Sequence, residues 1–205
     1  MQEYAVEDSV VVSAITQLIV RERESRDLGF WRRMRDCFHP DAEVNISWFQ
    51  GSGYDFVAGS KDMAARGMLA KHRLGPVLVT RNGNKAIASL SAIIDIPVEL
   101  EGKLFNLSAH SFLLYRVEER DGVWRLKSFE VIYRRDEFIP AIMGQTAALP
   151  EKLLSTFRAS YRNLSYSLHL KNFKIDMSLA GEDRPETVQA IYQKIYNWVG
   201  LPVPD

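Results

Sequence analysis

Residues 85–133 decide the fold, and they read KAIASLSAIIDIPVELEGKLFNLSAHSFLLYRVEERDGVWRLKSFEVIY. Apolar side chains recur at every second position over much of this stretch, which is the period of a β-strand with one buried face. Glu101-Gly102 and Asp121-Gly122 interrupt the alternation, and such glycine-containing pairs are typical of tight turns. The stretch therefore predicts three long antiparallel strands, over residues 85–99, 104–117 and 123–133.

A fourth strand is predicted immediately before them, through residues 78–80. It is joined to the next strand by a turn at residues 81–84, whose Asn82-Gly83 pair is a strong hairpin signal. The result is a four-stranded antiparallel meander. Strands of this length twist strongly, so we expect the sheet to curve into a half-barrel.

The residues before the sheet have the periodicity of helices. Apolar residues at i, i+3, i+4 and i+7 predict an amphipathic helix over residues 8–25. A shorter helix is predicted over residues 28–38 and stops at His39-Pro40, because proline lacks the N–H that a helix needs. A short strand follows at residues 44–48, and a third helix is predicted over residues 60–69, with Ser60 as its N-cap. With these helices on the concave face, the chain is expected to be an α+β protein: a cone-shaped half-barrel that encloses one apolar pocket.

The character of the sequence changes after residue 140. Residues 1–140 are expected to form the α+β barrel domain, and residues 141–205 a C-terminal helical extension. One helical run begins at Pro150, and another passes through residues 188–198. Both are amphipathic and rich in aromatic residues, so they must pack on something. The sequence leaves three alternatives for the surface that the extension covers: its own domain, a neighbouring subunit or the mouth of the pocket.

Composition excludes several classes of function. The 205 residues carry 26 basic and 26 acidic side chains, and this balance lacks the basic excess typical of nucleic-acid-binding domains. Cys37 is the single cysteine, so no internal disulfide is possible and a reducing compartment fits best. The N-terminus is acidic where a signal peptide is basic, and the most apolar stretch, residues 10–20, is shorter than the roughly 20 residues that a membrane span needs. We therefore expect a soluble, cytoplasmic protein without nucleic-acid or membrane partners.

The sequence contains none of the common cofactor motifs. A P-loop, a Gly-x-Ser-x-Gly elbow, a His-Glu-x-x-His helix and a cysteine–histidine cluster are all absent. Gly51-Ser52-Gly53 resembles half of a dinucleotide fingerprint but lacks the third glycine. We therefore expect neither a cofactor nor a metal.

Three titratable residues stand at positions from which they could point into the pocket. Asp27 lies at the break between the first two helices, His72 lies where the third helix gives way to the sheet, and His110 lies in the middle of a strand. An imidazole with a pKa of about 6.5 can act as a base at neutral pH. A carboxylate that accepts its other N–H fixes the tautomer and stabilises the imidazolium. Taken singly, each has a structural alternative, since buried histidines are usually hydrogen-bonded and Asp27 could cap a helix.

The order of elements and several short motifs resemble the SnoaL-like branch of the nuclear-transport-factor-2-like superfamily, which includes scytalone dehydratase and hexachlorocyclohexane dehydrochlorinase. The resemblance covers residues 10–138. It is carried by residues 27–40 and by His110-Ser111, Asp121-Gly122-Val123-Trp124, Arg134 and Glu137-Phe138.

This resemblance implies proton-transfer chemistry without metal or coenzyme. Asp27 and His72 match the dyad in which histidine is the base, and His110 matches a second histidine that the dehydratase uses. A second histidine across the pocket could protonate a leaving hydroxyl, and we expect His110 to have this role. The dehydratase's water-holding tyrosines are replaced here by Arg26 and Ile46. The scytalone reaction itself is therefore not expected, and Arg26, Lys71, Tyr133 or Trp48 would have to stabilise the anion instead.

The expected function is that of a cofactor-independent lyase acting on a small apolar, aromatic molecule. Water is the expected leaving group. The same residues would also serve retro-aldol loss of formaldehyde or another carbonyl fragment, loss of halide, or isomerisation. The predicted substrate-binding residues are Arg26, Trp48, Phe49, Phe56, Met63, Met68, Phe129 and Tyr133.

Two alternatives belong to other functional classes. Members of this superfamily include binding or assembly modules without chemistry, and the small subunits of ring-hydroxylating oxygenases share the fold. The resemblance also implies a homo-oligomer, either a dimer or a trimer.

Overall fold

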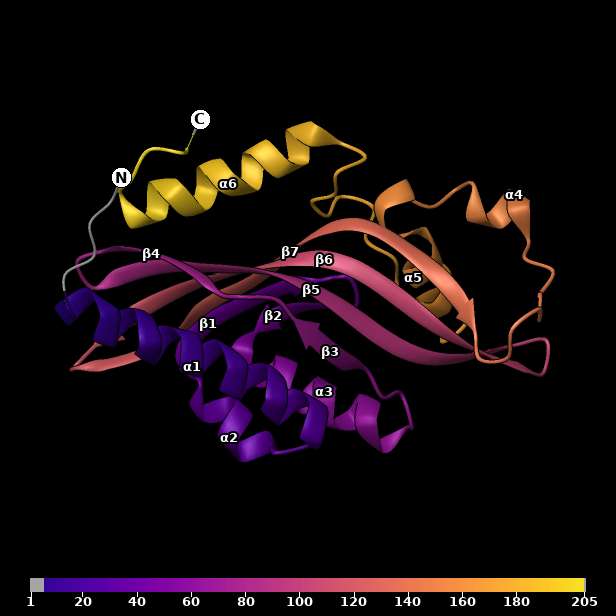
Figure 1. Cartoon of the computed structure of the whole chain (residues 1–205), viewed down its shortest axis with the longest axis horizontal. Coiled ribbons are helices and arrows are strands. Elements are labelled where there is room, and N and C mark those ends of the chain that lie inside the picture. The colour runs from indigo at the N-terminus through magenta and orange to yellow at the C-terminus, as the bar shows by residue number, and fades with distance from the viewer. Residues whose placement is uncertain (1–5, 205) are drawn as a thin grey trace.

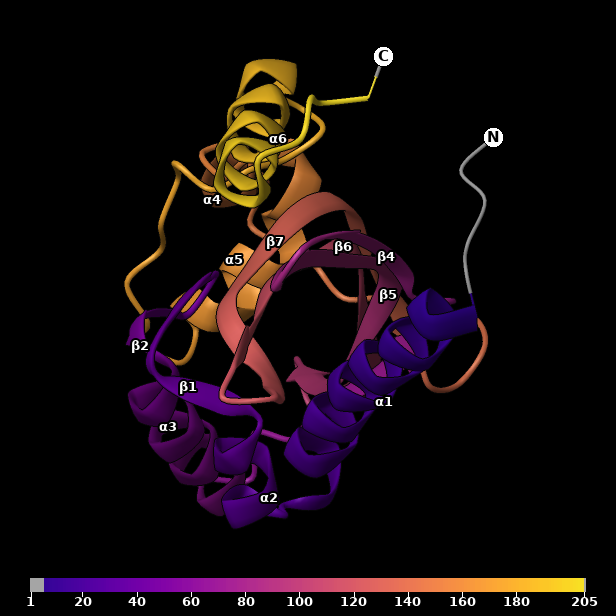
Figure 2. The same ribbon diagram turned by 90° about the vertical axis from the view of Figure 1, so that its left-hand side faces the viewer.

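A computed structural model describes residues 6–204 of the chain. In this part, a seven-stranded sheet curves around the helices of the N-terminal half and carries the last helix of the chain on its other side (Figures 1 and 2). The helices of the first half are α1 (Val6–Leu28), α2 (Trp31–Asp36) and α3 (Gly53–Ala65). The strands are β1 (Phe38–Ile46), β2 (Phe49–Ser52), β3 (Lys71–Leu74), β4 (Leu78–Asn82), β5 (Lys85–Leu100), β6 (Lys103–Arg120) and β7 (Val123–Pro140). The C-terminal part contains α4 (Glu151–Leu154), a 3₁₀ turn η1 (Ala159–Tyr161), α5 (Arg162–His169) and α6 (Pro185–Val199).

The predicted meander is confirmed, with β4, β5, β6 and β7 pairing in antiparallel order. The two long hairpins close where the sequence indicates. Glu101 and Gly102 have φ values of 50° and 71°, and Asp121 and Gly122 have 52° and 74°. Positive φ at both central residues matches the right-handed twist of the flanking strands, which explains why glycine stands second in each pair.

The sheet is larger than the meander. Its strand order is β2-β1-β7-β6-β5-β3, and β4 also pairs with β5. β1 runs parallel to β7, with Val44 opposite Phe129. His39 and Pro40 therefore do not stop a helix as predicted: α2 already ends at Asp36, and both residues lie in β1. The register between β1 and β7 shifts between Phe38 and Glu43, and such an irregularity tolerates a proline that cannot donate a hydrogen bond.

The third helix begins seven residues earlier than predicted, and its N-cap is Ser52 rather than Ser60. The Ser52 hydroxyl accepts the backbone N–H of Asp55 at 3.1 Å, which satisfies one of the free donors of the first turn. Ser60 is instead buried within the helix. The first residue of the helix, Gly53, lies so close to β1 that a Cβ there would be 2.7 Å from the ring of Phe38, which explains why this residue is glycine. The helix therefore packs directly on β1, beside the pocket.

The core lies on the concave side, between α1 and the long strands. Ile15 and Ile19 of α1 are fully buried against residues of β5, β6 and β7. The register between β6 and β7 shifts at His110/Ser111 and again at Arg116/Val117. Bulges of this kind bend a strand and increase its twist, which helps the sheet to wrap around the helices (Figure 2).

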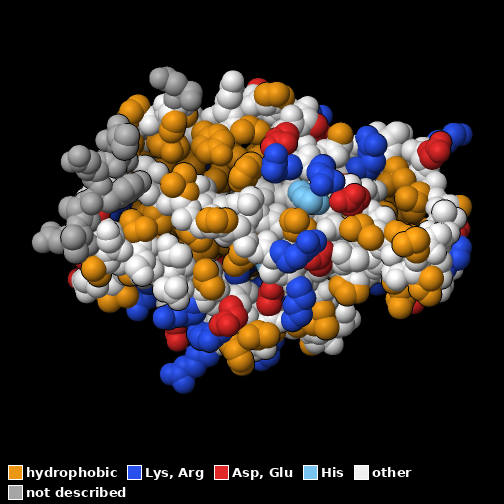
Figure 3. Space-filling model, viewed as in Figure 1, with side chains coloured by type: hydrophobic (Ala, Val, Ile, Leu, Met, Phe, Trp, Pro, Cys, Tyr) orange, Lys and Arg blue, Asp and Glu red, His pale blue; other side chains and the backbone are white. Residues whose placement is uncertain are grey.

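The convex side carries α6. Its Ile195 and Val199 are buried against Ile87, Leu114 and Ile132 of the sheet. Seen from the side of Figure 3, hydrophobic side chains gather along α6, and charged side chains of both signs gather near the middle of the face. None of the helices within residues 6–204 has the length and apolar character required to cross a membrane.

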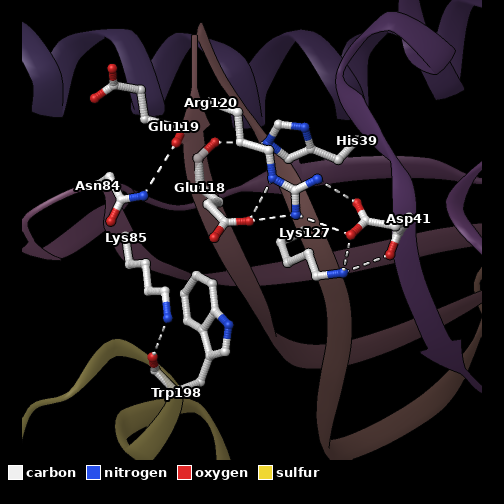
Figure 4. Close-up of polar contacts among 9 residues, drawn as sticks. All are labelled: His39, Asp41, Asn84, Lys85, Glu118, Glu119, Arg120, Lys127 and Trp198. Atoms are coloured by element: carbon white, nitrogen blue, oxygen red, sulfur yellow. Dashed lines mark hydrogen bonds and ion pairs between the residues drawn. The ribbon is translucent and has the colours of Figure 1, made fainter. Parts of the chain in front are cut away.

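Polar contacts join β1 to the β6–β7 hairpin, and α6 to β5, at one end of the sheet (Figure 4). Asp41 of β1 accepts hydrogen bonds from Arg120 at 2.8 Å and from Lys127 at 2.9 Å. These contacts tie the parallel strand to the β6–β7 hairpin. On the other side, the Lys85 ammonium lies 5.0 Å from the centre of the Trp198 ring, which anchors the end of α6 on β5.

Candidate active site

The structure brings Asp27 and His72 together at the junction of α1 and β3. Asp27 Oδ1 lies 2.6 Å from His72 Nδ1, and Asp27 Oδ2 accepts the backbone N–H of His72 at 2.7 Å. The side chains are 14% and 6% exposed, respectively. One carboxylate thus holds both the ring and the strand on which the ring stands.

The partners of His72 fix its tautomer. Nδ1 faces a carboxylate and so carries the ring proton. Nε2 lies 3.4 Å from Nη1 of Arg23, and a guanidinium group can only donate. The lone pair of Nε2 therefore points toward Arg23, and both residues line the same cavity. This is the protonation state that a general base requires.

The electrostatics of the pair favour a neutral imidazole beside an ionised carboxylate. Burial lowers the pKa of His72, the hydrogen bond that its ring donates to Asp27 opposes this shift, and the charge of Arg23 adds to the lowering, so the pKa lies below 6.5. Burial alone would raise the pKa of Asp27, but the hydrogen bonds and charge of His72 outweigh burial and hold that pKa below 3.8. His72 is therefore unprotonated at neutral pH.

A buried ion pair that sequence reasoning missed stands next to the dyad. Nε and Nη2 of Arg23 both donate to the carboxylate of Glu22, and both side chains are almost completely buried. The guanidinium carbon lies 4.6 Å from the centre of the Phe129 ring and 5.7 Å from that of Phe56. The available signal was the helical stripe of α1, because Glu22 and Arg23 continue the buried face formed by Ile15 and Ile19.

A cavity of about 70 Å³ lies beside His72 and Arg23, several times the room that one buried water needs. Six of the predicted substrate-binding residues line it, namely Arg26, Trp48, Phe56, Met63, Phe129 and Tyr133. The wall is mainly apolar and aromatic, as expected.

The prediction that Phe49 and Met68 line this cavity is wrong. Phe49 packs on the outer side of the aromatic cluster, 5.5 Å from the Trp48 ring and 5.7 Å from the Phe56 ring. It lines a neighbouring groove together with residues 174–177. Met68 follows the end of α3 in a turn, and its backbone N–H bonds back to Met63. The hydrophobic periodicity of the sequence could not distinguish Phe49 and Met68 from the residues that line the cavity, because both groups are apolar and lie close together in the chain.

His110 does not point into the pocket, which corrects the predicted triad. On β6 the inward residues are Ala109 and Leu113, both of which belong to the main core. His110 has the opposite orientation, lies 3.4 Å from Glu137, and lines a surface groove with Arg73 and Arg134. It is therefore separated from the Asp27–His72 pair by the thickness of the sheet.

The C-terminal extension closes the pocket of its own chain. Leu164 and Leu168 of α5 form part of the cavity wall. Asp136 of β7 holds the start of this helix, because its carboxylate accepts the backbone N–H of Leu164 at 2.7 Å. Arg158, which is almost fully buried, pairs with Asp183 at 2.7 Å and fixes the ends of the segment that contains α5. These contacts hold α5 in place against the cavity.

The other polar groups predicted to help the reaction differ in their placement. Tyr133 lines the cavity, and its hydroxyl oxygen accepts the backbone N–H of Ser47 at 2.8 Å, which leaves its own O–H free to donate. Burial raises the pKa of Tyr133 to about 12. Arg26 also lines the cavity, and burial, reinforced by the charge of Arg23, lowers its pKa to about 10. Lys71 is exposed and donates to the backbone oxygen of Asp27, outside the cavity wall.

Residues 10–130 match the family described as SnoaL-like domain. The chain belongs to the SnoaL-like family. The resemblance that the sequence motifs indicated is therefore confirmed, and so is the curved α+β fold.

Two curated relatives of this SnoaL-like chain come from fungi. It is 29% identical over 144 residues to a PEP2-like protein of Fusarium vanettenii, a match that covers 69% of this chain and 62% of the relative. It is 26% identical over 153 residues to an uncharacterized protein of Emericella nidulans, with coverages of 71% and 64%. The chain thus spans less than two thirds of the length of either relative.

Solved structures share the SnoaL-like fold at low identity. A putative scytalone dehydratase from Novosphingobium aromaticivorans has a TM-score of 0.53 and 15% identity, over 68% of this chain and 97% of that one. A hexachlorocyclohexane dehydrochlorinase, LinA-type3 from Novosphingobium barchaimii, has a TM-score of 0.55 and 16% identity, over 71% and 99%. At this level of identity, the likeness concerns the fold.

Proposed function

We propose that this SnoaL-like protein is a cofactor-independent lyase that acts on a small, apolar, aromatic substrate. The observation that carries the proposal is the contact between Asp27 and His72 at the edge of a mainly apolar, aromatic cavity. Two similar folds, the putative dehydratase and the dehydrochlorinase, are named for eliminations, and the same reaction class suits this pocket.

The first step is proton removal from a substrate carbon by Nε2 of His72. Asp27 keeps the ring in the tautomer that presents this lone pair, and it stabilises the imidazolium that forms. Acid–base assistance of this kind contributes about 10²–10⁴-fold to a rate. The electron pair left by the proton forms the new double bond and expels the leaving group from the neighbouring carbon.

The leaving group requires a proton if it departs as water. With His110 on the other face of the sheet, the Tyr133 hydroxyl is the proton donor within the cavity wall. The proton that His72 has taken then returns to Tyr133, so that no external acid or base is consumed. Loss of a carbonyl fragment or of halide from the same carbon skeleton would proceed with the same base.

The test is a comparison of Asp27→Asn and His72→Ala with the wild-type protein. Aromatic β-hydroxy carbonyl compounds are screened for binding by thermal shift and then for turnover by product analysis in deuterated water. Substrate carbon should exchange its proton with solvent in the wild type and not in His72→Ala. Binding without turnover or exchange in the wild type would exclude the lyase and favour a binding module. Full rates in both variants would exclude the dyad.

A further inference from the structure

The outer face of the sheet carries a groove of about 340 Å³ that the proposed reaction does not use. Its wall includes Arg73 of β3, Ser91 and Ile93 of β5, His110 of β6 and Arg134 of β7. These strands lie side by side in the order β7-β6-β5-β3, so the two arginines stand on opposite sides of the groove. Neighbouring strands are ~4.8 Å apart, which separates β7 from β3 by ~14 Å, a span that two arginine side chains can close from opposite sides.

The residues between the two arginines share their face of the sheet. Ile93 pairs with Arg73 on one side and with His110 on the other, and directly paired residues of antiparallel strands point to the same face. His110 faces outward, so Ile93 and Arg73 do as well. A ligand in the groove would therefore lie on an apolar side chain and an imidazole, with a guanidinium group at each side.

A β-bulge places Arg134 on this outer face. The register between β6 and β7 shifts after His110, which pairs with Arg135, and Arg134 is the extra residue of β7. In a regular strand, consecutive side chains point to opposite faces, and one of the two arginines would enter the core. Here both are exposed, and the guanidinium carbon of Arg134 lies 4.8 Å from the centre of the Phe112 ring. Bulges that re-aim a side chain are common beside functional sites.

Carboxylates hold both arginines from outside the groove wall. Asp95 accepts hydrogen bonds from Nε and Nη2 of Arg73 at 2.6 and 3.0 Å, and Glu182 accepts one from Nε of Arg134 at 2.7 Å. In the part of the chain that the structure describes, Nη1 of Arg73 and both Nη atoms of Arg134 have no hydrogen-bond partner. The described residues that line the groove include no aspartate or glutamate. Both guanidinium groups are thus oriented by acids behind them and retain donors for an anion.

We propose that this groove binds the phosphate group of a small organic phosphate monoester. A planar guanidinium group can donate two parallel hydrogen bonds to phosphate oxygens. The exposed Ser91 hydroxyl, which has no hydrogen-bond partner among the described residues, is a third donor group. These donors come from β7, β5 and β3, and the three free oxygens of a tetrahedral phosphate can use all of them, whereas a flat carboxylate has only two oxygens. Ile93 offers an apolar surface to the organic part.

The bound phosphate is not the substrate of the proposed reaction. The groove and the Asp27–His72 pair lie on opposite faces of the sheet, so one small molecule cannot contact both. The ligand is therefore a second molecule, and the proposal does not depend on the chemistry assigned to His72.

Isothermal titration calorimetry with phenyl phosphate, in a phosphate-free buffer, tests the proposal. We expect the wild type to bind it, and Arg73→Met and Arg134→Met each to bind it about 10-fold more weakly, the value of one charge-assisted hydrogen bond at an exposed site. Arg32→Met removes the same charge from an exposed position on α2 and should bind as the wild type does. Inorganic phosphate and benzoate should both bind more weakly than phenyl phosphate. Thermal unfolding checks that each variant is folded.

Equal affinity of the wild type and the folded Arg73→Met/Arg134→Met double variant would overturn the proposal, because phosphate would then bind elsewhere. Absence of binding by the wild type at millimolar phenyl phosphate would overturn it too, and equal affinity for benzoate would overturn the assignment of a phosphate group. Sedimentation velocity is measured on the same samples. A wild-type dimer that the double variant dissociates, without any phosphate binding, would make the groove a contact between copies of the chain and exclude the ligand site.

Discussion

Asp27 contacts His72 twice, through the ring Nδ1 at 2.6 Å and through the backbone N–H at 2.7 Å. The side-chain contact sets the tautomer of the base, and the backbone contact joins the end of α1 to the short strand β3. Orientation of the ring and attachment of the strand therefore depend on the same carboxylate. Substitutions that keep one contact and lose the other can separate these two effects.

Asp27→Asn should lower kcat by about 10²- to 10⁴-fold while the chain remains folded. The amide oxygen can still accept the backbone N–H of His72, but it no longer provides a charge that stabilises the imidazolium. The measurement is steady-state kinetics together with thermal unfolding. Asp27→Ala, which loses both contacts, should in addition lower the unfolding temperature. An Asp27→Asn variant with the wild-type kcat would contradict the role given to this carboxylate.

Activity and stability should both decline in mild acid because of His72. Its pKa is lower in the folded chain than the ordinary 6.5, so below that value the unfolded chain binds the proton more readily. Folding stability is therefore complete above about pH 6.5 and falls as the pH drops toward the lowered pKa. The check is urea unfolding at a series of pH values between about 7 and 5, where His72→Gln should remove part of the slope.

The lowered pKa of Asp27 acts in the same direction at lower pH. Its contribution to stability is present above the ordinary value of 3.8 and is lost as the pH falls through the lower folded value.

In kinetics, log(kcat/KM) should rise with pH through the pKa of His72. Asp27→Asn should move this inflection to lower pH, because the hydrogen bond and the charge of Asp27 both raise the pKa of His72. An inflection that moves upward would contradict the assignment.

The local rules of hairpins made the meander predictable. Glu101-Gly102 and Asp121-Gly122 determine both turn geometry and register, and the long strands follow from them. The parallel pairing of β1 with β7 has no such local signal, because residues such as Val44 and Phe129 meet only in the folded chain. The start of α3 depends on Ser52, whereas the sequence pattern predicted Ser60 as the N-cap.

Part of the candidate site could also be predicted from the sequence. Asp27 and His72 stand at ends of elements, where family resemblance and chemistry point to the same residues. His110 was misplaced because both faces of β6 are apolar: Leu113 faces the inner core, while Leu114 is buried beneath α6. Alternation then cannot tell which face is concave. Arg23 was missed because a charged residue on a helix is usually exposed.

His110→Ala should leave kcat and KM within about twofold of the wild type, the size of effect expected for surface substitutions away from a site. The side chain contacts Glu137 on the outer face of the sheet and cannot reach a substrate held beside His72. Steady-state kinetics on the same substrate as the Asp27 series gives the answer. A large loss of kcat would mean that the outer groove takes part in the reaction.

Tyr133→Phe should affect turnover in a manner that depends on the leaving group. Loss of the hydroxyl removes the proposed proton donor, so elimination of water should slow by about 10²-fold or more, while elimination of a halide should change little. The variant also loses the bond from the Ser47 N–H, at a cost of about 1 kcal/mol in the free energy of unfolding. A pair of substrates that differ only in the leaving group makes the comparison, and equal slowing of both would argue against the role.

Leu164→Ala and Leu168→Ala should enlarge the set of accepted substrates, because both side chains close the pocket from α5. Each truncation should cost about 2–5 kcal/mol of unfolding free energy, as for other buried leucines. Leu154→Ala is the matched control, since Leu154 is also buried in the C-terminal part but does not line the cavity. Urea unfolding and thermal-shift screens with larger aromatic ligands are measured for all three. If Leu154→Ala gains the same ligands as the α5 variants, the gain comes from general loosening; if only the α5 variants gain them, the helix sets the size limit of the pocket.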